Sequence, residues 1–327
     1  MSRIAFAALM VFCGLNALAN QSAIVRTKVA SMTLPEAIEF VRPSVVQISA
    51  RIDPVPNPSG PIPIPGRPAI VPLGTGFMVN AEGYVITARH VIEALQSLQV
   101  PGNKRLLIGV ALPNLENFKA GGASISIRGS FANVECDVVE EDALHDIALL
   151  KMKQNPFTGG MGMFMKTPEG SINYPHKVAT LLPGRPQDGE RIAVSGYPLS
   201  NTVLVTTSGN LASAWDYETK QLQMPGARGG FPIPENVDSY LADMHVNPGN
   251  SGGPVYSVEQ GSVIGICVSF QPAPIVYGDA GPRDRPLYFN SGLSNVVPIR
   301  YAIDLLKKNN LKWTEQKNVS DSGRAKK

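Results

Sequence analysis

Asn247-Pro248-Gly249-Asn250-Ser251-Gly252-Gly253-Pro254 is the stretch around which this chain is organised. It places one serine among glycines and turn-forming residues, with an apolar run on each side. Glycine has no Cβ, so the backbone here can take conformations closed to other residues and can approach another segment closely. An exposed hydroxyl beside free backbone N–H groups supplies a nucleophile and an oxyanion hole. Because such a serine is inert without a base, the hypothesis requires a histidine and a carboxylate elsewhere.

Four histidines are candidate bases: His90, His145, His176 and His245. His90 comes directly after a strand-like run and at the start of a turn, so the end of a strand would present its ring. His145 neighbours Asp146, but adjacent residues on a strand point to opposite faces. His176 lies in a loop without a motif. His245 is close in sequence to the candidate serine and could be near it in space.

Asp146 is the candidate acid, because it begins a strongly apolar run, 147–150. A carboxylate at the edge of such a run is costly to bury unless it is hydrogen-bonded. A triad acid, which orients the histidine, is in this situation. The alternative interpretation is a cap at the start of a strand.

Chain order separates the possible folds. Gly249-x-Ser251-x-Gly253 formally matches the nucleophile elbow of α/β-hydrolases, which requires a histidine after the serine. No histidine follows Ser251, so this interpretation fails. An order of Asp146, His176 and Ser251 remains open on paper. The order His90, Asp146, Ser251 is the chymotrypsin order.

The composition favours an all-β architecture, because 31 glycines and 28 prolines in 327 residues indicate many turns. The net charge of +3 is too small to indicate a nucleic-acid partner. The number of short strands fits two β-barrels of similar size, divided near 155–188. Helical spacing appears at 34–41 and 297–309, and proline-rich loops are expected at 53–72 and 272–292. The predicted strands cover 44–52, 74–80, 84–87, 106–112, 124–127, 132–140, 146–152, 178–182, 191–197, 202–213, 240–246, 254–256 and 262–270.

Residues 1–19 have the pattern of a secretory signal peptide, with a short apolar run before Ala17-Leu18-Ala19. We expect cleavage after Ala19 and an exported protein, periplasmic or secreted; the alternative is an uncleaved anchor. No later segment is apolar for long enough to span a membrane. Cys136 and Cys267 would remain, and buried free thiols are expected rather than a disulfide. Residues 313–327 are expected to form a disordered basic tail.

Three motifs together resemble the signatures of trypsin-like serine peptidases. They are Thr87-Ala88-Arg89-His90-Val91, Asp146-Ile147-Ala148-Leu149-Leu150 and Gly249-Asn250-Ser251-Gly252-Gly253-Pro254. The likeness is closest to the bacterial HtrA/Deg-type peptidase domain, whose first strands resemble Gly74-Thr75-Gly76-Phe77. It implies two six-stranded β-barrels of the chymotrypsin type, with a short N-terminal helix and a C-terminal helix. The implied peptidase domain covers 20–312, with barrel 1 at about 34–154, barrel 2 at about 185–297 and the closing helix at about 297–309.

The resemblance implies a serine endopeptidase acting on proteins or peptides. His90 would take the proton of Ser251, Asp146 would orient His90, and the N–H groups of Gly249 and Ser251 would receive the oxyanion. This chemistry needs no metal or organic cofactor. The alternatives are a catalytically silent or latent binding protein on the same fold, and an esterase using the same triad.

Alignment with the family also places His245 and Cys267 near the walls of the primary pocket. Val268 and Ser269 would belong to the strand with which the substrate backbone pairs. His245 would then favour an acidic substrate side chain or close the pocket, and the alternative is a structural role. The resemblance favours small or medium apolar residues before the scissile bond.

The sequence departs from the family in two places, and one further residue bears on activation. Arg89 stands where the family usually has a small or amide residue. No PDZ domain is expected after the closing helix, and the oligomeric state is not predicted. Asn250 replaces the aspartate that pairs with a new N-terminus in digestive zymogens, so activation is expected to need only removal of the signal peptide.

Overall fold

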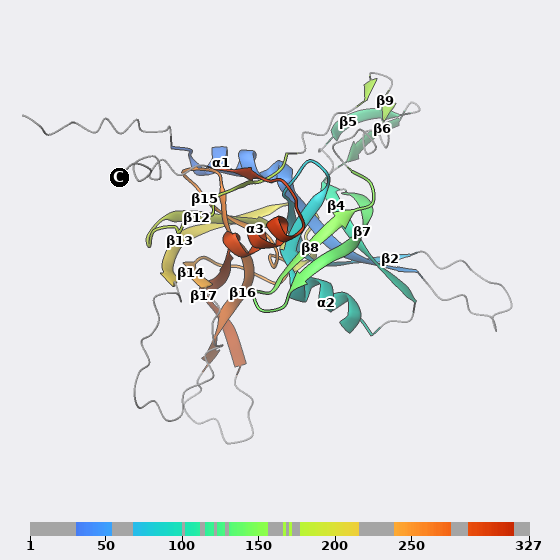
Figure 1. The fold of residues 1–327 in the computed structure, drawn as a ribbon. Helices are drawn as coiled ribbons and strands as arrows, with labels where there is room; N and C mark the ends of the chain where they lie inside the picture. Colours follow the sequence, from blue (N-terminus) through green and yellow to red (C-terminus); the bar gives the residue numbers. More distant parts are fainter. Residues whose placement is uncertain are drawn as a thin grey trace, which may run out of the picture. The chain divides into compact units, whose positions relative to one another are not determined.

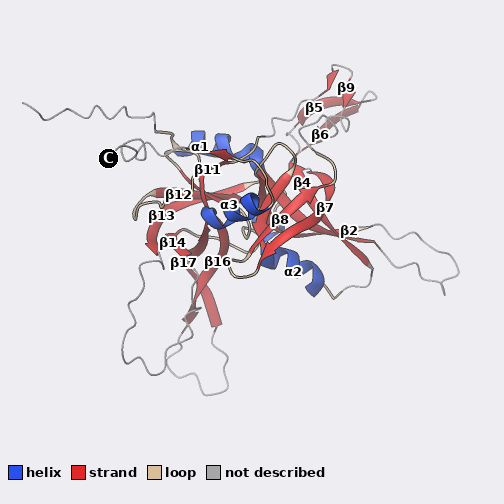
Figure 2. Cartoon of the chain, in the orientation of Figure 1, coloured by secondary structure: helices blue, strands red, loops and turns tan. Residues whose placement is uncertain are grey.

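The computed structural model of the chain describes residues 31–53, 68–99, 102–111, 115–120, 123–127, 131–155, 166–167, 170–171, 177–215, 239–275 and 287–316. The chain divides into two units, Met1–Ser31 and Met32–Lys327, and the description below concerns the second. Strands dominate the described residues (Figure 2). The predicted signal peptide and His176 lie outside the described residues, as does most of the predicted tail.

Six antiparallel strands close the first barrel in the order β1-β2-β3-β8-β7-β4 (Figure 1). Side chains alternate between the two faces of these strands, and in β1, β3 and β8 both faces are buried. Val46 and Leu150 belong to one apolar cluster, whereas their neighbours Val45 and Leu149 belong to another. The strands are β1 (Val45–Asp53), β2 (Ala69–Met78), β3 (Tyr84–Ala88), β4 (Asn103–Ala111), β7 (Phe131–Asp142) and β8 (Ile147–Met152).

The second barrel uses β15-β12-β13-β14-β17-β16, and a pairing of β15 with β16 closes the ring. Two short strands, β11 (Thr180–Leu181) and β18 (Thr314–Glu315), extend the sheet beside β16 in parallel. The prediction of an all-β protein with two six-stranded barrels is therefore confirmed. The strands are β12 (Arg191–Gly196), β13 (Val205–Trp215), β14 (Ser239–Asp243), β15 (Pro254–Ser257), β16 (Val263–Ile275) and β17 (Leu287–Pro298).

Three α-helices lie in the described part of the chain: α1 (Leu34–Val41), α2 (Arg89–Ser97) and α3 (Ile299–Lys308). The first begins with a capping box between Thr33 and Glu36. The third buries Ile303 and Leu306 in the cluster that also holds Phe77 of the first barrel and Tyr256 of the second. Each fully buried aliphatic side chain of this kind contributes about 1.5–3 kcal/mol. A shared core therefore sets how the two barrels meet.

Two short 3₁₀ helices, Arg42–Ser44 and Pro198–Ser200, and two smaller two-stranded sheets complete the described elements. One pairs β5 (Leu115–Ala120) with β6 (Ala123–Ile127), and the other pairs β9 (Lys166–Thr167) with β10 (Gly170–Ser171). No helix among the described residues is long and apolar enough to span a membrane.

Several boundaries differ from the sequence-based expectation. Residues 272–275 and 287–292, expected in a loop, belong to β16 and β17, which pair with each other. Residues 69–72, expected in a loop, pair with β1 in β2. The first residues of the expected tail form β18, because Thr314 and Glu315 pair with β11. In the sequence, prolines and polar residues at the edges of a sheet indicate a loop. These segments are strands because they pair with neighbouring strands, and this pairing depends on the fold.

Candidate active site

The loop that carries Ser251 lies between β14 and β15 and packs against the first barrel. Gly249 (φ +101°) and Gly252 (φ +83°) have left-handed conformations that favour glycine. A Cβ on Gly252 would lie 2.1 Å from the carbonyl oxygen of Thr75 and 2.2 Å from the hydroxyl of Thr87. The glycine thus lets the loop touch strands β2 and β3 backbone to backbone.

Thr75 on β2 makes three hydrogen bonds to the second barrel, and two of them hold this loop. Its backbone N–H donates to the carbonyl of Ser251 at 2.9 Å. Its fully buried hydroxyl donates to the carbonyl of Gly249 at 2.6 Å and accepts the N–H of Tyr197 at 3.0 Å. One side chain of the first barrel therefore links two loops of the second.

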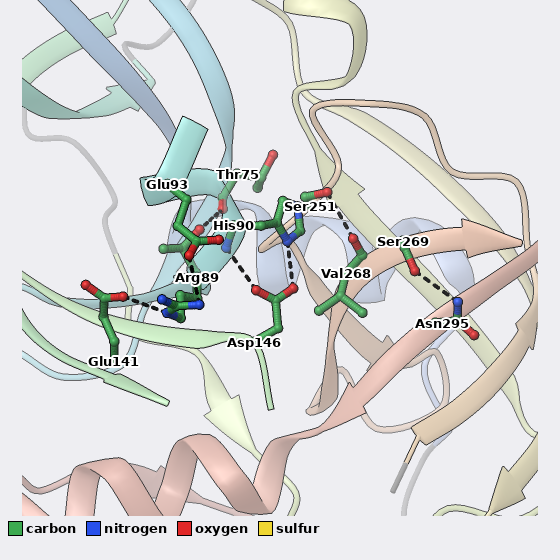
Figure 3. A network of polar contacts seen from close by, with 11 residues as sticks. Thr75, Arg89, His90, Glu93, Glu141, Asp146, Ser251, Val268, Ser269 and Asn295 are labelled. Carbon is green, nitrogen blue, oxygen red and sulfur yellow. Dashed lines mark hydrogen bonds and ion pairs between the residues drawn. The ribbon is translucent and has the colours of Figure 1, made fainter. Parts of the chain in front are cut away.

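His90 and Asp146 meet because β3 and β8 are neighbours in register, with Ala88 opposite Ile147. His90 is the second residue of α2, which follows β3 directly, and Asp146 immediately precedes β8. One carboxylate oxygen lies 2.6 Å from Nδ1 of His90, and the other accepts the backbone N–H of His90 at 2.8 Å (Figure 3). Both oxygens therefore orient the same histidine.

Asp146 has a left-handed backbone (φ 55°), a conformation that costs an L-residue about 1–2 kcal/mol. Its carbonyl accepts the N–H of Arg89 at 2.9 Å, which helps to hold this conformation. Strain of this kind persists only where surrounding contacts determine the backbone, and it is frequent at functional sites.

The Ser251 hydroxyl lies beside His90 in Figure 3, but its hydrogen bond is directed elsewhere. It donates to the carbonyl of Val268 on β16 at 3.2 Å. Among the described residues, no hydrogen bond joins this hydroxyl to His90. Nucleophile–base contacts are often long or poorly aligned without substrate.

The backbone around Ser251 presents free donors. Within the described chain, neither the N–H of Gly249 nor that of Ser251 has a hydrogen-bond partner. The carbonyl of Pro248 accepts the N–H of Leu199 at 2.7 Å. Because C=O and N–H point in opposite directions across a trans peptide, this bond aims the Gly249 N–H away from Leu199. The arrangement can stabilise an anion beside Ser251.

Sequence reasoning did not single out Leu199 or the role of Thr75. Leu199 (φ 54°) and Ser200 (φ 60°) are consecutive non-glycine residues with left-handed backbones. Neither of these two positions holds a glycine or an asparagine, so the sequence gives no signal for a left-handed backbone there. Thr75 belongs to a quoted motif, but its contacts arise only when both barrels have formed.

Arg89, which directly precedes His90, forms ion pairs with two carboxylates. Its guanidinium lies 2.8 Å from Glu93 and 2.8 Å from Glu141. A second histidine–carboxylate pair is separate from this site. His145 lies 2.6 Å from Asp142 and stacks on Tyr301 of α3, with ring centroids 3.6 Å apart.

A cavity of about 200 Å³ opens beside Ser251. Its wall combines the apolar side chains of Val246, Cys267 and Phe270 with the backbone of the serine loop. Burial raises the pKa of the Cys267 thiol to about 12, so the thiol is neutral. The predicted pocket residues Cys267, Val268 and Ser269 line this cavity.

His245 is placed differently from the pocket wall that the alignment implied. It is exposed, and its ring packs against Gly292, where an added Cβ would lie 3.0 Å from the ring. Its neighbour Val246 is buried and lines the cavity instead. Within the described residues, no group of three or more His, Cys, Asp or Glu side chains is placed to share a metal ion. A larger cavity of about 710 Å³ is lined by residues of the first barrel. His90, Asp146 and Ser251 are not among its lining residues.

Residues 74–266, more than half of the chain, match the profile of the trypsin-like peptidase domain. The chain belongs to the trypsin-like peptidase family. Relatives include putative protease Do-like 14 of Arabidopsis thaliana, 26% identical over 226 residues that cover 69% of this chain and 42% of that protein. Serine protease HTRA1 of Xenopus tropicalis is 26% identical over 196 residues, covering 59% of this chain and 30% of that protein. The chain spans less than half the length of these relatives.

Among solved structures, the fold is similar to an HtrA-type protease, AlgW with a decapeptide. The TM-score is 0.51 at 17% sequence identity, covering 84% of this chain and 67% of that one. The expected resemblance to HtrA-type trypsin-like peptidases is thus confirmed. In this trypsin-like peptidase, the serine loop of the second barrel contacts β2 and β3 of the first.

Proposed function

We propose that this trypsin-like peptidase is a serine endopeptidase in which His90, Asp146 and Ser251 form the catalytic triad. The observation that carries the proposal is the double contact of Asp146 with His90 beside Ser251. The free N–H groups of Gly249 and Ser251 support it, because they offer two donors to the same reacting centre.

In the proposed reaction, His90 removes the hydroxyl proton as Ser251 forms a bond to the peptide carbonyl carbon. The carbonyl electron pair moves to oxygen, and the N–H groups of Gly249 and Ser251 stabilise the resulting oxyanion. Collapse of this intermediate breaks the C–N bond, and His90 gives the proton to the leaving amine. Water then hydrolyses the acyl-enzyme by the same steps. Asp146 stabilises the charged imidazole throughout.

The cavity beside Ser251 supports a preference for small or medium apolar residues before the scissile bond. Its volume of about 200 Å³ suits one aliphatic side chain. The neutral thiol of Cys267 and the side chain of Val246 offer no charged partner. A charged substrate side chain would therefore lose its hydration without compensation.

A peptide-library digest followed by mass spectrometry tests this function. Wild type is expected to cleave peptides after small or medium apolar residues, and Ser251→Ala is expected to cleave none. Equal cleavage by both proteins would reject Ser251 as the nucleophile. Turnover of simple esters without any peptide cleavage would favour an esterase.

The second candidate is a latent or silent binding protein, and one observation favours it. The Ser251 hydroxyl donates its hydrogen bond to the carbonyl of Val268 rather than to His90. A correctly folded wild type that binds peptides but cleaves none would support this candidate.

The proposed location is outside the cytoplasm, in the periplasm or secreted, and the proposed peptidase domain covers 20–312. Both rest on the signal-like segment at residues 1–19. N-terminal sequencing of the protein from its native host is expected to give Asn20 as the first residue. An N-terminus at Met1 in the active protein would contradict the proposal.

A further inference from the structure

Arg89 contacts the histidine–aspartate pair with its backbone and extends away from it with its side chain. It is the first residue of α2 and directly precedes His90. Its N–H donates to the carbonyl of Asp146 at 2.9 Å, and the N–H of His90 donates to the Asp146 carboxylate at 2.8 Å. Two consecutive backbone donors therefore hold Asp146 against the start of α2.

The guanidinium of Arg89 is shared between two carboxylates (Figure 3). Its Nε donates to Oε2 of Glu141 at 2.8 Å, and its Nη1 lies 2.8 Å from Oε1 of Glu93. Glu93 is four residues further along the same helix, whereas Glu141 belongs to β7. The two ion pairs have the same distance but join different parts of the structure.

The pair with Glu141 spans the start of the strand that follows Asp146. Strands β3, β8 and β7 are consecutive in the first barrel. Arg89 directly follows β3, and Glu141 of β7 lies opposite Ala148 of β8. Ala148 is two residues after Asp146. The side chain of Arg89 therefore reaches from the end of β3, past the start of β8, to β7.

The stability of α2 alone does not explain an arginine at this position. Ala88, the N-cap of α2, offers no side-chain hydrogen bond, and the first turn has no acidic residue. The helix dipole favours anions rather than cations at this end. An arginine four residues before a glutamate is also the less favourable order for a pair within a helix. The local sequence of the helix therefore favours another residue at position 89.

The histidine–aspartate pair depends on contacts of this kind, because packing holds it only in part. The side chains of His90 and Asp146 are 41% and 36% exposed. Asp146 ends a turn, 143–146, and has a left-handed backbone. Such a conformation persists only where surrounding contacts determine it.

We propose that Arg89 is a positioning residue that, through Glu141, holds the turn of Asp146 in the geometry that orients His90. This inference rests on the proposed function. The backbone of Arg89 contacts Asp146, and its side chain anchors this contact to β7. Without the anchor, the start of α2 and the turn move more freely relative to each other. His90 is then aligned with Ser251 for less of the time, which lowers the rate of the reaction rather than substrate binding.

The competing explanation is an ion-pair network without any consequence for the site. Partly exposed ion pairs contribute little to stability. This explanation predicts that removing either glutamate has no effect, or that both removals have the same effect by loosening α2. Positioning predicts that only the link to Glu141 affects the reaction.

Steady-state kinetics with one peptide substrate distinguish the two explanations. Arg89→Gln and Glu141→Gln are each expected to lower kcat and kcat/KM about 3- to 10-fold, while KM stays within about twofold. The double variant is expected to be no slower than either single variant, because both changes remove the same link. The matched control is Glu93→Gln, which removes a carboxylate at the same distance from the same guanidinium. Its kcat is expected to stay within about twofold of wild type.

Proton NMR of the free protein measures the geometry without turnover. The proton in a short hydrogen bond between histidine and carboxylate resonates at low field. The signal of His90 with Asp146, identified by its loss in Asp146→Asn, is expected to shift or broaden in Arg89→Gln. His145 and Asp142 form a pair with the same distance of 2.6 Å, and its signal is expected to stay unchanged as an internal control.

A kcat within twofold of wild type in Arg89→Gln would overturn the inference. Equal losses in Glu93→Gln and Glu141→Gln, or losses that multiply in the double variant, would also overturn it. A thermal midpoint that falls by more than about 4 °C, with changes in both NMR signals, would show general loosening instead of positioning. If the NMR signals behave as expected but wild type cleaves no peptide, only the proposed function fails.

Discussion

The hydroxyl of Thr75 donates a hydrogen bond to the carbonyl of Gly249 at 2.6 Å, so a strand of the first barrel holds the serine loop of the second. The same hydroxyl accepts the N–H of Tyr197 at 3.0 Å, at the start of the turn that contacts Pro248. The geometry around Ser251 thus depends on the contact between the barrels as well as on the loop itself.

Replacing Thr75 by valine is expected to lower kcat about 10-fold or more, because it leaves two buried backbone groups without partners and loosens the oxyanion donors. The free energy of unfolding is expected to fall by about 1–3 kcal/mol. The measurements are steady-state kinetics and urea unfolding. Thr75→Ser keeps the hydroxyl and is expected to restore kcat. A kcat equally low in both variants would show that the methyl group matters rather than the hydrogen bonds.

Asp146→Asn is expected to lower kcat by a factor on the order of 10⁴ while the protein stays folded, because the amide no longer favours the histidine tautomer that can accept the serine proton. Single-turnover kinetics with a peptide substrate measure this effect. The matched control is Asp142→Asn, which breaks the other histidine–carboxylate pair. Its kcat is expected to stay within a few-fold of wild type. Equal losses in the two variants would argue against Asp146 as the triad acid.

Cys136 and Cys267 are expected to resist thiol reagents in the folded protein. Burial raises the pKa of both thiols from the usual 9.0 to about 12, so both are protonated at pH 8 and shielded from solvent. Titration with a thiol reagent at pH 8 should detect neither thiol until denaturant is added. Because the folded pKa lies above the unfolded value, the stability due to the neutral thiols is complete below about pH 9 and is lost as the pH rises towards 12. Rapid modification of native Cys267 would contradict the placement of this residue.

Cys267→Ala is expected to enlarge the cavity beside Ser251 and shift preference from valine towards leucine before the scissile bond. One methylene in an apolar pocket changes selectivity by about 10-fold or more. The ratio of kcat/KM for a matched pair of peptides measures the shift. Cys136→Ala removes a thiol from the first barrel and serves as the control, with an unchanged ratio. No difference between the two variants would reject Cys267 as part of the pocket wall.

The sequence predicted the fold class and the three motifs because strand patterning and chain order are local signals. The meeting of His90 with Asp146 follows from the register of β3 and β8, which places the ends of two short strands side by side. The left-handed turn at Leu199 was not predictable, because no residue there favours a positive φ. The prediction of the pocket wall depended on which of two neighbouring side chains faces the cavity. Val246 lines the cavity, and His245 is exposed instead.

The extended β16–β17 hairpin was missed for a related reason. Pro272 and Pro274 indicate a loop unless the edge on which their missing N–H groups fall is known. That edge becomes apparent only from the pairing of β16 with β17, which continues past both prolines.

Fluorophosphonate labelling, read by peptide mass spectrometry, tests the central claim that His90 and Asp146 activate Ser251. We expect an adduct on Ser251 in wild type, labelling at least about 100-fold slower in His90→Ala, and no adduct in Ser251→Ala. A folded wild type without an adduct on Ser251, or one labelled as fast in His90→Ala as in wild type, would contradict it.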